Sequence, residues 1–550
     1  MDTITWDPPG PGPWQQDSAH NPVSQTALMQ EIYPEGFNKG FTEAFAGYGL
    51  LLDRLAMGVV NGFTYHQPQP FDMPGPDGPK DPEWIGAEIG RRTEVAAQAV
   101  ADQIWRDEIA EWDAEIKPAA QARHRELGSV DLGALDDAEL LAHLQTCMTH
   151  VGAMAYQHHR YNCHALVPVG DFVLQAAAWT HRPPMSLFGV LDGFSPVSNV
   201  LSPEIQNAVT ALRADQDALD LLRSAGHPVE VLGTLRTRVP AVDDYVANVH
   251  FRLIEGFDVV NPTIGERPDA ILGRLGAAVA MTGNPSIERA DALAASLRAD
   301  VPAEHREEFD DLLGEARRVY RLRDERGIYS DISAVGLLRL TLLEIGRRQV
   351  AAGNMTDAEL AFELHTDELE AILSGSAGPG NDELQRRRDH RLRLTLDGPP
   401  RYLGPPPPDP PPLETLPPPL ARVMAAVGFT IDGILGQLDE PAGTSTSIAG
   451  IAGAAGVYEG TARLVKSIDD LLTLEPGDVL VAPTTGEAFN SMLHLVGAIV
   501  TDHGSFASHA AIVSREMGIP SVVGTVNATT RIEDGARVRV DGSTGTVDIL

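Results

Sequence analysis

Residues 498–524 read AIVTDHGSFASHAAIVSREMGIPSVVG, and this stretch decides the fold expected for the C-terminal part of the chain. The apolar run 498–501 predicts a buried strand, and a short glycine-containing loop follows it. Residues 508–517 have the spacing of a helix that ends at a glycine, and residues 521–523 predict a second strand. We therefore expect strand, loop, helix and strand in succession.

This pattern places His509 at a helix N-terminus. Ser508 is a favourable N-cap residue, so His509 is expected on the first helical turn. Free backbone N–H groups and the positive end of the helix dipole meet there, and both stabilise negative charge. A phosphoryl group bonded to the imidazole would suit this position, and the labile P–N bond would let it be passed on. On spacing alone, an ordinary polar first-turn residue is the alternative.

The motif around His509 resembles the phosphohistidine motif of the mobile, swivelling domain of phosphoenolpyruvate-utilising enzymes. The shared pattern is a glycine-rich loop, a serine or threonine, the run HAAIV, then RE and GIP, all within 498–524. The resemblance implies that His509 is the phosphorylated, catalytic residue. Four nearby residues are candidates for contact with phosphate: His503, Gly504, Ser505 and Ser508. For His503, a loop histidine without a function is the alternative.

The chain departs from the family at one point of this loop. The family usually has two glycines where this chain has Gly504 and Ser505, and a serine is tolerated there if its φ is negative. Arg515 lies six residues after His509 and is expected on another side of the helix, where a surface or interdomain ion pair is favoured. Glu516 shares the face of His509 two turns away, and both residues are expected to be structural or docking residues.

The remaining C-terminal sequence predicts a compact α/β domain over residues 447–550. Short apolar segments at 456–465 and 479–481 predict strands separated by glycine turns, and 537–549 predict a hairpin. These segments also look like parts of the swivelling domain.

Residues 1–396 predict a mostly α-helical domain, expected to bind the substrate. Residues up to 84 are rich in proline, glycine and aromatics, and they are expected to be irregular with short helices. Beyond them, apolar residues recur at three- and four-residue spacing, which is typical of amphipathic helices. The predicted helices cover 89–116, 136–159, 203–224, 287–298, 304–323 and 335–352. The fold expected for the whole chain is multidomain.

Residues 397–446 are expected to be a linker with a short helix. The stretch 398–420 reads GPPRYLGPPPPDPPPLETLPPPL, and proline fixes φ and removes hydrogen-bond donors. Such a segment is an extended, semi-rigid spacer. Its composition fits a passive tether, and the resemblance adds a swinging-arm role.

The composition limits the partners of the chain. The formal charge is −35, from 77 acidic against 42 basic residues, which disfavours nucleic acid and anionic membranes. The two cysteines, Cys147 and Cys163, do not form a disulfide framework and fit a reducing cytoplasm. The N-terminus lacks the features of a signal peptide, and no apolar run is long enough for a membrane span.

A dense polar cluster lies at 156–164, YQHHRYNCH, at the expected end of a helix. A face lining the substrate or a satisfied helix interior would each explain it. His159 and Cys163 are four residues apart, but nothing else completes a metal site, so no metal is expected. The full set of substrate-binding candidates is His158, His159, Arg323, Arg326, Tyr329 and Asp331. For the last four, a salt-bridged helix end is the alternative.

The order of helical domain, linker and histidine domain is similar to the later part of rifampin phosphotransferase and to the histidine-bearing part of phenylphosphate synthase. The sequence shows no glycine-rich loop of an ATP-grasp domain and no TIM barrel after the histidine domain. The resemblance therefore implies a separate ATP-grasp partner that holds ATP and Mg²⁺, with no cofactor on this chain. The partner would phosphorylate His509 while splitting ATP to AMP and phosphate.

The expected acceptor is a small-molecule hydroxyl, phenolic or alcoholic, bound in the helical domain. A phosphohistidine carrier or regulatory subunit that docks to another protein is the alternative to this enzymatic function.

Overall fold

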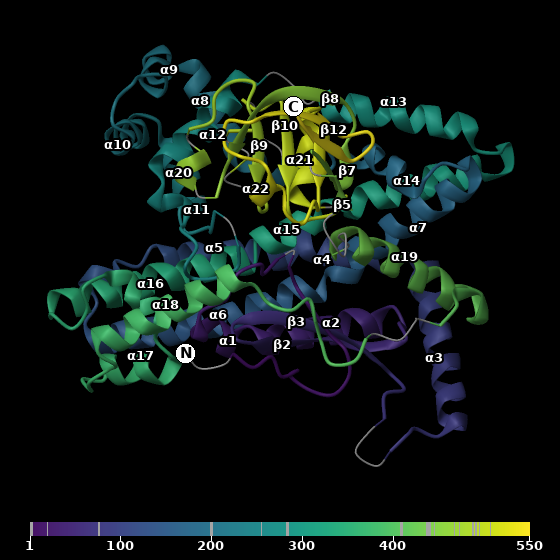
Figure 1. Ribbon diagram of the computed structural model, residues 1–550, viewed down its shortest axis with the longest axis horizontal. Helices are drawn as coiled ribbons and strands as arrows, with labels where there is room; N and C mark the ends of the chain where they lie inside the picture. The colour runs from purple at the N-terminus through teal and green to yellow at the C-terminus, as the bar shows by residue number, and fades with distance from the viewer. Residues whose placement is uncertain are drawn as a thin grey trace. The chain divides into compact units, whose positions relative to one another are not determined.

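The computed structural model shows two compact units, each built from separate segments of the chain (Figure 1). The first unit contains Met1–His164, Asn248–Thr263 and Arg326–Met424, and the second contains Ala165–Ala247, Ile264–Glu325 and Ala425–Leu550. The division falls inside several helices, and the domain bounds predicted from the sequence stay a prediction. The structure describes all residues except 1–3, 19, 75–77, 199–201, 255, 282–284, 407–410, 436–441, 445, 467, 472, 487–488, 490–491, 494 and 507.

A small antiparallel sheet forms one part of the first unit. Its strand order is β2-β3-β1-β4, and Phe63 and Tyr65 of β3 lie in the core beneath it. The strands are β1 (Trp14–Gln16), β2 (Leu52–Val60), β3 (Phe63–Pro70) and β4 (Tyr402–Leu403). The short helices expected up to residue 84 are present at 27–32 and 34–47, but the expectation that the rest is irregular was wrong, because a long hairpin occupies 52–70.

The β4 strand also corrects the description of the linker. Tyr402 and Leu403 lie within the predicted spacer, yet they pair with Gln15 and Trp14 of β1. Leu403 is buried. At this point the segment is part of a folded sheet. Other parts of the predicted linker, 407–410, 436–441 and 445, lie outside the described residues.

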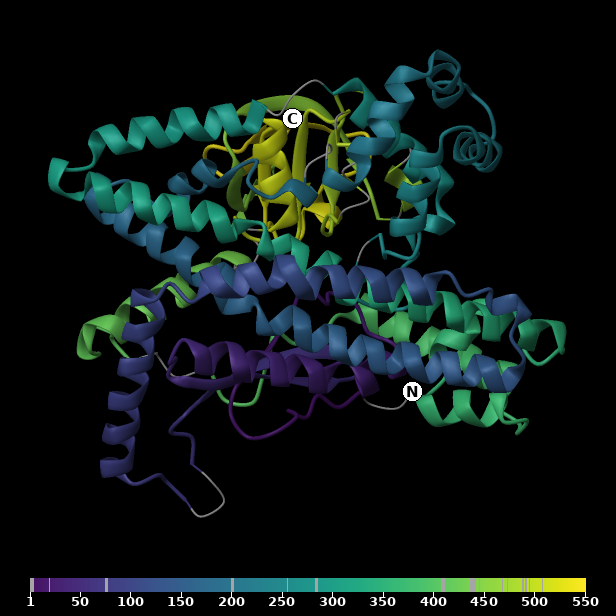
Figure 2. The ribbon, with the colours of Figure 1, turned by 180° about the vertical axis from the view of Figure 1, so that it is seen from behind.

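Two helices of the first unit pack unusually closely. α2 (Pro34–Gly47) and α6 (Asp137–Arg160) lie side by side in Figure 1 and Figure 2. A Cβ atom at Gly40 would lie 2.7 Å from the carbonyl oxygen of Tyr156, and one at Gly36 would collide with the backbone of Gly152. Glycine at these positions lets the backbones approach. The end of α6 thereby reaches the side chains at the start of α2.

The other helices of the first unit confirm most of the predicted helical segments. The stretch 89–116 is interrupted, because Gln103 has a φ of 51° between α3 and α4 and a π-helix covers Trp112–Ile116. α16 begins at Asp331 and is buried along most of its length. The remaining helices are α1 (Ala27–Ile32), α3 (Pro82–Ala101), α4 (Trp105–Glu111), α5 (Lys117–Gly128), α16 (Asp331–Ala351), α17 (Thr366–Leu373) and α18 (Asn381–Asp397).

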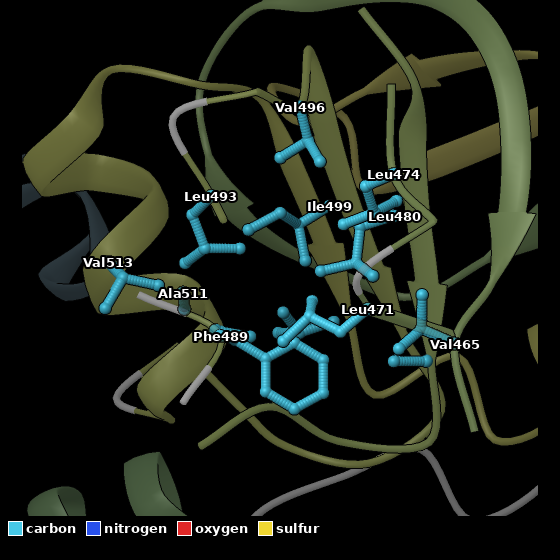
Figure 3. Close-up of a cluster of buried hydrophobic side chains, with 13 residues drawn as sticks. Val465, Leu471, Leu474, Leu480, Phe489, Leu493, Val496, Ile499, Ala511 and Val513 are labelled. Carbon is cyan, nitrogen blue, oxygen red and sulfur yellow. The ribbon is translucent and has the colours of Figure 1, made fainter. Parts of the chain in front are cut away.

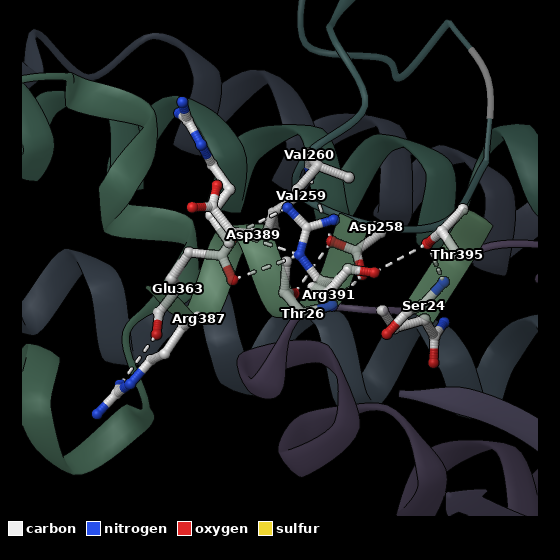
Figure 4. A network of polar contacts seen from close by, with 12 residues as sticks. Ser24, Thr26, Asp258, Val259, Val260, Glu363, Arg387, Asp389, Arg391 and Thr395 are labelled. Atoms are coloured by element: carbon white, nitrogen blue, oxygen red, sulfur yellow. Dashed lines mark hydrogen bonds and ion pairs between the residues drawn. The ribbon is translucent and has the colours of Figure 1, made fainter. Parts of the chain in front are cut away.

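Polar contacts connect distant segments of this unit (Figure 4). The carboxylate of Asp258 accepts hydrogen bonds from the backbone N–H and the hydroxyl of Thr26, at 2.8 and 3.0 Å. On α18, Arg391 pairs with Glu363 at 2.7 Å. The buried carboxylate of Asp258 is thus compensated by donors, as a desolvated charge requires.

The second unit contains a nine-stranded mixed sheet with the order β5-β6-β13-β12-β8-β9-β10-β11-β7. Strands β8 to β11 run parallel, and β12 pairs antiparallel with β8. The predicted α/β fold of the C-terminal part is confirmed. The strands are β5 (Ala442–Gly443), β6 (Ser447–Ala449), β7 (Ile451–Ala454), β8 (Val457–Leu464), β9 (Val479–Ala482), β10 (Ala498–Thr501), β11 (Ser521–Val523), β12 (Arg537–Asp541) and β13 (Thr546–Ile549).

α21 (His509–Met517) covers one face of this sheet through an aliphatic core (Figure 3). Ala511 and Val513 of the helix pack with Leu480 and Ile499 of the strands, and Phe489 joins them from a loop. Burial of these side chains fixes the helix on the sheet. The N-terminus of α21 therefore lies where the parallel strands β9 and β10 end.

Helices from several parts of the chain complete the second unit. The predicted helix 203–224 is divided at Asp215, whose side chain caps the second half. No helix in the described part of the chain is long and apolar enough to cross a membrane. These helices are α8 (Pro203–Ala214), α9 (Gln216–Leu222), α10 (Pro228–Arg238), α12 (Pro268–Ala280), α13 (Pro285–Asp300), α14 (Arg306–Tyr320), α20 (Ile468–Leu471) and α22 (Ala528–Arg531); α7 (Asn162–Thr180), α11 (Pro240–Val249), α15 (Leu322–Ile328) and α19 (Pro418–Leu435) belong to both units.

Candidate functional site

His509 is the first residue of α21, as the sequence predicts. Ser508 precedes it with extended backbone angles, φ −71° and ψ 160°, which are those of an N-cap residue. The Ser508 side chain makes no capping bond to the described backbone, and its Oγ atom is buried without a partner there. The Ser508 hydroxyl is therefore available for a hydrogen bond with a ligand at the N-terminus of α21.

The His509 ring is held at one nitrogen only. Its Nδ1 atom lies 2.8 Å from Thr485 Oγ1, while its Nε2 atom is buried and finds no hydrogen-bond partner among the described residues. The residue as a whole is only partly buried. If Nδ1 carries the proton and donates it to Thr485, the lone pair of Nε2 is the reactive site.

The loop before the helix accommodates the departure from two glycines. Gly504 has a φ of 110°, a conformation that favours glycine, whereas Ser505 is not among the described non-glycine residues with positive φ. A Cβ atom at Gly504 would lie 2.8 Å from Ser508 Oγ. Glycine is needed at the first position for both reasons, and Ser505 satisfies the condition stated for a serine at the second.

A third buried polar atom without a hydrogen-bond partner in the described structure lies in the loop before α21. Within the described structure, His503 Nδ1 is buried without a hydrogen-bond partner, like His509 Nε2 and Ser508 Oγ. Burial lowers the pKa of His503, and nearby Asp502 opposes that effect. Buried polar atoms are normally satisfied, so three exceptions in one loop and helix start indicate a place for a polar ligand.

His509 is neutral at physiological pH. Burial lowers the pKa of its imidazole to about 4, with Arg323 adding to the decrease and Asp324 opposing it. A neutral imidazole has a free lone pair and can act as a nucleophile.

Arg323 therefore lies near His509 and not with the other acceptor candidates. Its Nη1 atom and Tyr320 OH are both buried, and neither has a partner in the described part of the chain. Arg323 pairs with Asp324 at 3.1 Å, and its Nη1 atom remains an unused donor close enough to influence the charge of His509. A guanidinium with spare donors is well suited to hold phosphate oxygens.

Arg515 and Glu516 at the other end of α21 face helical segments of the same unit. Arg515 lies 3.4 Å from Asp192 and donates to the carbonyl oxygens of Gly453 and Phe506. Burial raises the pKa of Glu516 to about 8, and the carboxylates of Asp324 and Asp192 add to the increase. These contacts fit the structural role expected for both residues.

The first unit contains a second polar cluster, at the end of α6. His158 Nδ1 lies 2.7 Å from Asp331 Oδ2, and Tyr33 OH donates to the same oxygen at 2.5 Å. Tyr33 OH also lies 3.1 Å from His159 Nε2. Four residues from three distant parts of the sequence thus share one hydrogen-bonded group, of which the sequence indicated all except Tyr33.

Asp17, His20 and His66 extend this cluster. His20 Nδ1 lies 3.1 Å from Asp17 Oδ1, and His66 Nε2 lies 3.9 Å from Asp17 Oδ2. Burial alone would raise the pKa of Asp17, but the two histidines lower it, and Asp17 in turn raises the pKa of His20. None of these three residues was among the predicted site residues, and all come from the segment expected to be irregular.

The remaining acceptor candidates are only partly brought together. Arg326 donates to the carbonyl oxygen of His158 at 3.4 Å and so lies at the cluster. Tyr329 instead lies under two cations, Lys117 and Arg252, each 5.3 Å from its ring centre. Tyr329 therefore contributes to a cation–π arrangement of the helical interior.

The ring geometry argues against one metal ion bound by both histidines. Ligand atoms of His158, His159 and Asp331 lie within 4.8 Å of one another. However, the two rings are stacked at 11°, with centres 4.4 Å apart. A ligated metal lies along the nitrogen lone pair, in the ring plane, so two parallel stacked rings cannot share an ion without one of them rotating.

Comparison with known proteins agrees with the fold of the C-terminal part. Residues 474–545 match the PEP-utilising enzyme mobile domain. The chain is 31% identical over 245 residues to the uncharacterized phosphotransferase YvkC of Bacillus subtilis, covering 44% of this chain and 27% of YvkC. It is also 31% identical over 222 residues to a rifampicin phosphotransferase of a Streptomyces species, covering 40% of this chain and 23% of that protein.

A large synthase shares a similar region. The chain is 34% identical over 271 residues to chondramide synthase cmdD of Chondromyces crocatus, which is 48% of this chain and 7% of the synthase. The chain thus spans about a quarter or less of the length of these relatives. A solution structure of Enzyme I is 16% identical over 48% of this chain and 65% of its own chain, with a TM-score of 0.15. The C-terminal part of the chain is therefore a PEP-utilising enzyme mobile domain, and relatives that share similar regions include proteins named as phosphotransferases.

Proposed function

We propose that the chain is a phosphotransferase component in which His509 carries the phosphoryl group. The observation that supports this most directly is the state of the imidazole. Thr485 holds Nδ1, and Nε2 is left without a partner in the described structure, at the first turn of α21. A nucleophile positioned by one nitrogen and unoccupied at the other is suited to receive phosphorus.

The environment fits the charge of a phosphoryl group. The N-terminus of α21 offers free N–H groups, and the unused donors of Arg323 lie near the ring. Ser508 Oγ adds a hydroxyl to the same place. The phosphoryl group would form a bond from phosphorus to Nε2, and the positive groups would compensate its negative oxygens.

The donor in this proposal is ATP bound to an ATP-grasp partner. The relatives are about four times longer than the aligned regions, which leaves room in them for a nucleotide-binding part. The partner would hold Mg²⁺ with the nucleotide and split ATP to AMP and phosphate, leaving one phosphoryl group on His509.

The acceptor in this proposal is a hydroxyl group on a small molecule. The rifampicin phosphotransferases are named for a small-molecule acceptor. In this chain, the polar cluster of Tyr33, His158, His159 and Asp331 is the candidate acceptor site. An acceptor oxygen would attack phosphorus, the bond to Nε2 would break, and His509 would keep the bonding electron pair.

The test is phosphorylation with labelled ATP and the ATP-grasp partner. The chain should gain label that is labile to acid and stable to base, as expected of phosphohistidine. His509→Ala should abolish this label, and His227→Ala, a substitution at an exposed histidine of the same unit, should retain it. Label that persists in His509→Ala would refute the assignment. Stable label without transfer to any hydroxyl would favour the alternative of a non-catalytic carrier.

A further inference from the structure

The polar cluster of the first unit is too costly to be a simple packing feature. It gathers side chains from near the N-terminus, from β3, from α6 and from the start of α16, and most of them are buried. Burying titratable groups costs free energy that an apolar interior of the same volume would avoid. Such clusters therefore mark functional sites. The members are Asp17, His20, Tyr33, His66, His158, His159, Arg326 and Asp331.

Within this cluster, Asp331 fixes the orientation and tautomer of His158. Asp331 is fully buried, and its carboxylate accepts from Tyr33 OH at 2.5 Å and from the backbone N–H of Ile332 at 3.1 Å. The 2.7 Å contact to His158 Nδ1 is therefore a bond to a rigidly held acceptor. With Nδ1 donating to the carboxylate, the lone pair of His158 is on Nε2.

Burial and the surrounding charges keep His158 unprotonated. Burial lowers the pKa of His158 most strongly, Arg326 and His20 lower it further, and Asp331 raises it. His159 is stacked on the same ring and is also neutral, because burial holds its pKa well below the usual value. The carboxylate can stabilise the imidazolium that forms when His158 accepts a proton.

A separate observation indicates that this cluster receives a ligand. His66 is more than nine-tenths buried, and its Nε2 atom lacks a hydrogen-bond partner within the described residues. Phe37 stacks on His66 at 4.9 Å and contacts His159 at 4.3 Å. Phe41 stacks on His159, and Phe257 lies 6.3 Å from His158. A planar molecule with a hydrogen-bonding group would match both features.

We propose that His158 is the general base for a phenolic acceptor and that Asp331 is its positioning residue. The inference rests on the function proposed for His509. In the step, the proton of the phenol moves from its oxygen to His158 Nε2, and the oxygen forms a bond to phosphorus. The bond between phosphorus and His509 Nε2 breaks, and its electron pair stays on His509. The aryl phosphate leaves, and His158 later returns the proton to solvent.

Two acceptors that differ in acidity test this role. The chain is first phosphorylated at His509 with phosphoramidate, and the product is followed by phosphorus NMR. Phenol or 4-nitrophenol is then added at pH 8, and formation of each aryl phosphate is timed. Phenol must lose its proton in the reaction, whereas 4-nitrophenol is already largely ionised. A general base is therefore needed for the first acceptor and not for the second.

His158→Gln should slow transfer to phenol by about 10²-fold or more and leave transfer to 4-nitrophenol nearly unchanged. Asp331→Asn should also lower the ratio of the transfer rate to phenol over the transfer rate to 4-nitrophenol. His143→Gln, on the same helix α6 but outside the cluster, should keep the wild-type ratio. Because both acceptors are compared in one preparation, any loss of folded protein cancels from the ratio.

Each other outcome overturns a defined part of the reasoning. Equal loss with both acceptors, or an unchanged ratio, would show that His158 is not the base. Wild-type protein that loads but phosphorylates neither phenol would refute the phenolic acceptor and the base together, while leaving the carrier role of His509 intact. A chain that does not load at His509 would overturn the proposed function and this inference with it.

Discussion

Thr485→Val tests the link between the loop around residue 485 and the reactivity of His509. The substitution keeps the branched shape and replaces a hydroxyl by a methyl group. It removes the partner of His509 Nδ1, which lies at 2.8 Å in the structure. Because Thr485 is buried, solvent does not readily supply a substitute. The ring should lose both its preferred rotation and its preferred tautomer.

The size of the effect follows from one hydrogen bond. A neutral intramolecular hydrogen bond contributes about 1 kcal/mol net, which is roughly fivefold in an equilibrium constant. The ratio of the Nδ1–H to the Nε2–H tautomer of His509 should fall by about that factor. The rate of phosphorylation at Nε2 should fall at least in proportion to the remaining fraction of the Nδ1–H tautomer, since only this tautomer offers the Nε2 lone pair.

Nitrogen NMR of the imidazole at pH 7 measures the tautomer ratio, and loading with phosphoramidate measures the rate. Thr530→Val, at an exposed threonine of the same unit, is the control and should change neither value. A wild-type tautomer ratio in Thr485→Val would refute the positioning role of the hydroxyl. So would a reduced rate with the ratio unchanged, because the loss would then come from another cause.

Three further substitutions test the surroundings of His509. Gly504→Ala should cost about 1–3 kcal/mol in the free energy of unfolding and slow loading, because φ is 110° and the new Cβ would lie 2.8 Å from Ser508 Oγ; urea unfolding measures the cost. Arg323→Met should raise the pKa of His509, which burial and Arg323 together lower, and should shorten the lifetime of the phosphohistidine severalfold; NMR titration and label decay measure both. Glu516 holds its proton up to about pH 8 in the folded state but loses it near the usual Glu pKa in the unfolded state. The free energy of unfolding should therefore fall by up to roughly 1.4 kcal/mol per pH unit as the pH rises between these two values. Glu516→Gln should remove this pH dependence from thermal unfolding curves.

The sequence was most informative where the structure depends on neighbouring residues. Ser508 and His509 were placed at the start of a helix from the strand, loop and helix pattern alone, and the structure has them there. The condition on Ser505 could also be stated from the sequence, since backbone sterics alone require it. The strands of the C-terminal sheet were found for the same reason, because short apolar runs between glycines are local signals.

The sequence was least informative where the site depends on distant contacts. Thr485 lies 24 residues before His509, in a segment with no regular pattern, so only the fold shows that the two meet. Tyr33 and His66 belong to the part that was expected to be irregular. Close packing of α2 on α6 brings Tyr33 to the histidines, and the glycines that permit it carry no obvious pattern in a single sequence.

Arg323 and Arg326 show a third limit. The two residues lie three positions apart at the end of an expected helix, and both were candidates for one acceptor site. The structure instead brings Arg323 to His509 and Arg326 to His158, in different compact units. Helical periodicity gives the direction of a side chain relative to its own helix, and it does not give the packing partner.

The partners of the two histidines match the two tasks proposed for them. A carrier must stay neutral to attack phosphorus, and Thr485, an uncharged hydroxyl, orients His509 without favouring its imidazolium form. A base must accept a proton, and Asp331 supplies His158 with a buried carboxylate that stabilises the imidazolium. Replacing the hydroxyl partner of His509 by a carboxylate should therefore favour the imidazolium form of His509. Thr485→Asp should raise the pKa of His509 and slow its phosphorylation at pH 7, although the orienting contact is kept. An unchanged pKa of His509 in that variant would contradict this division of roles.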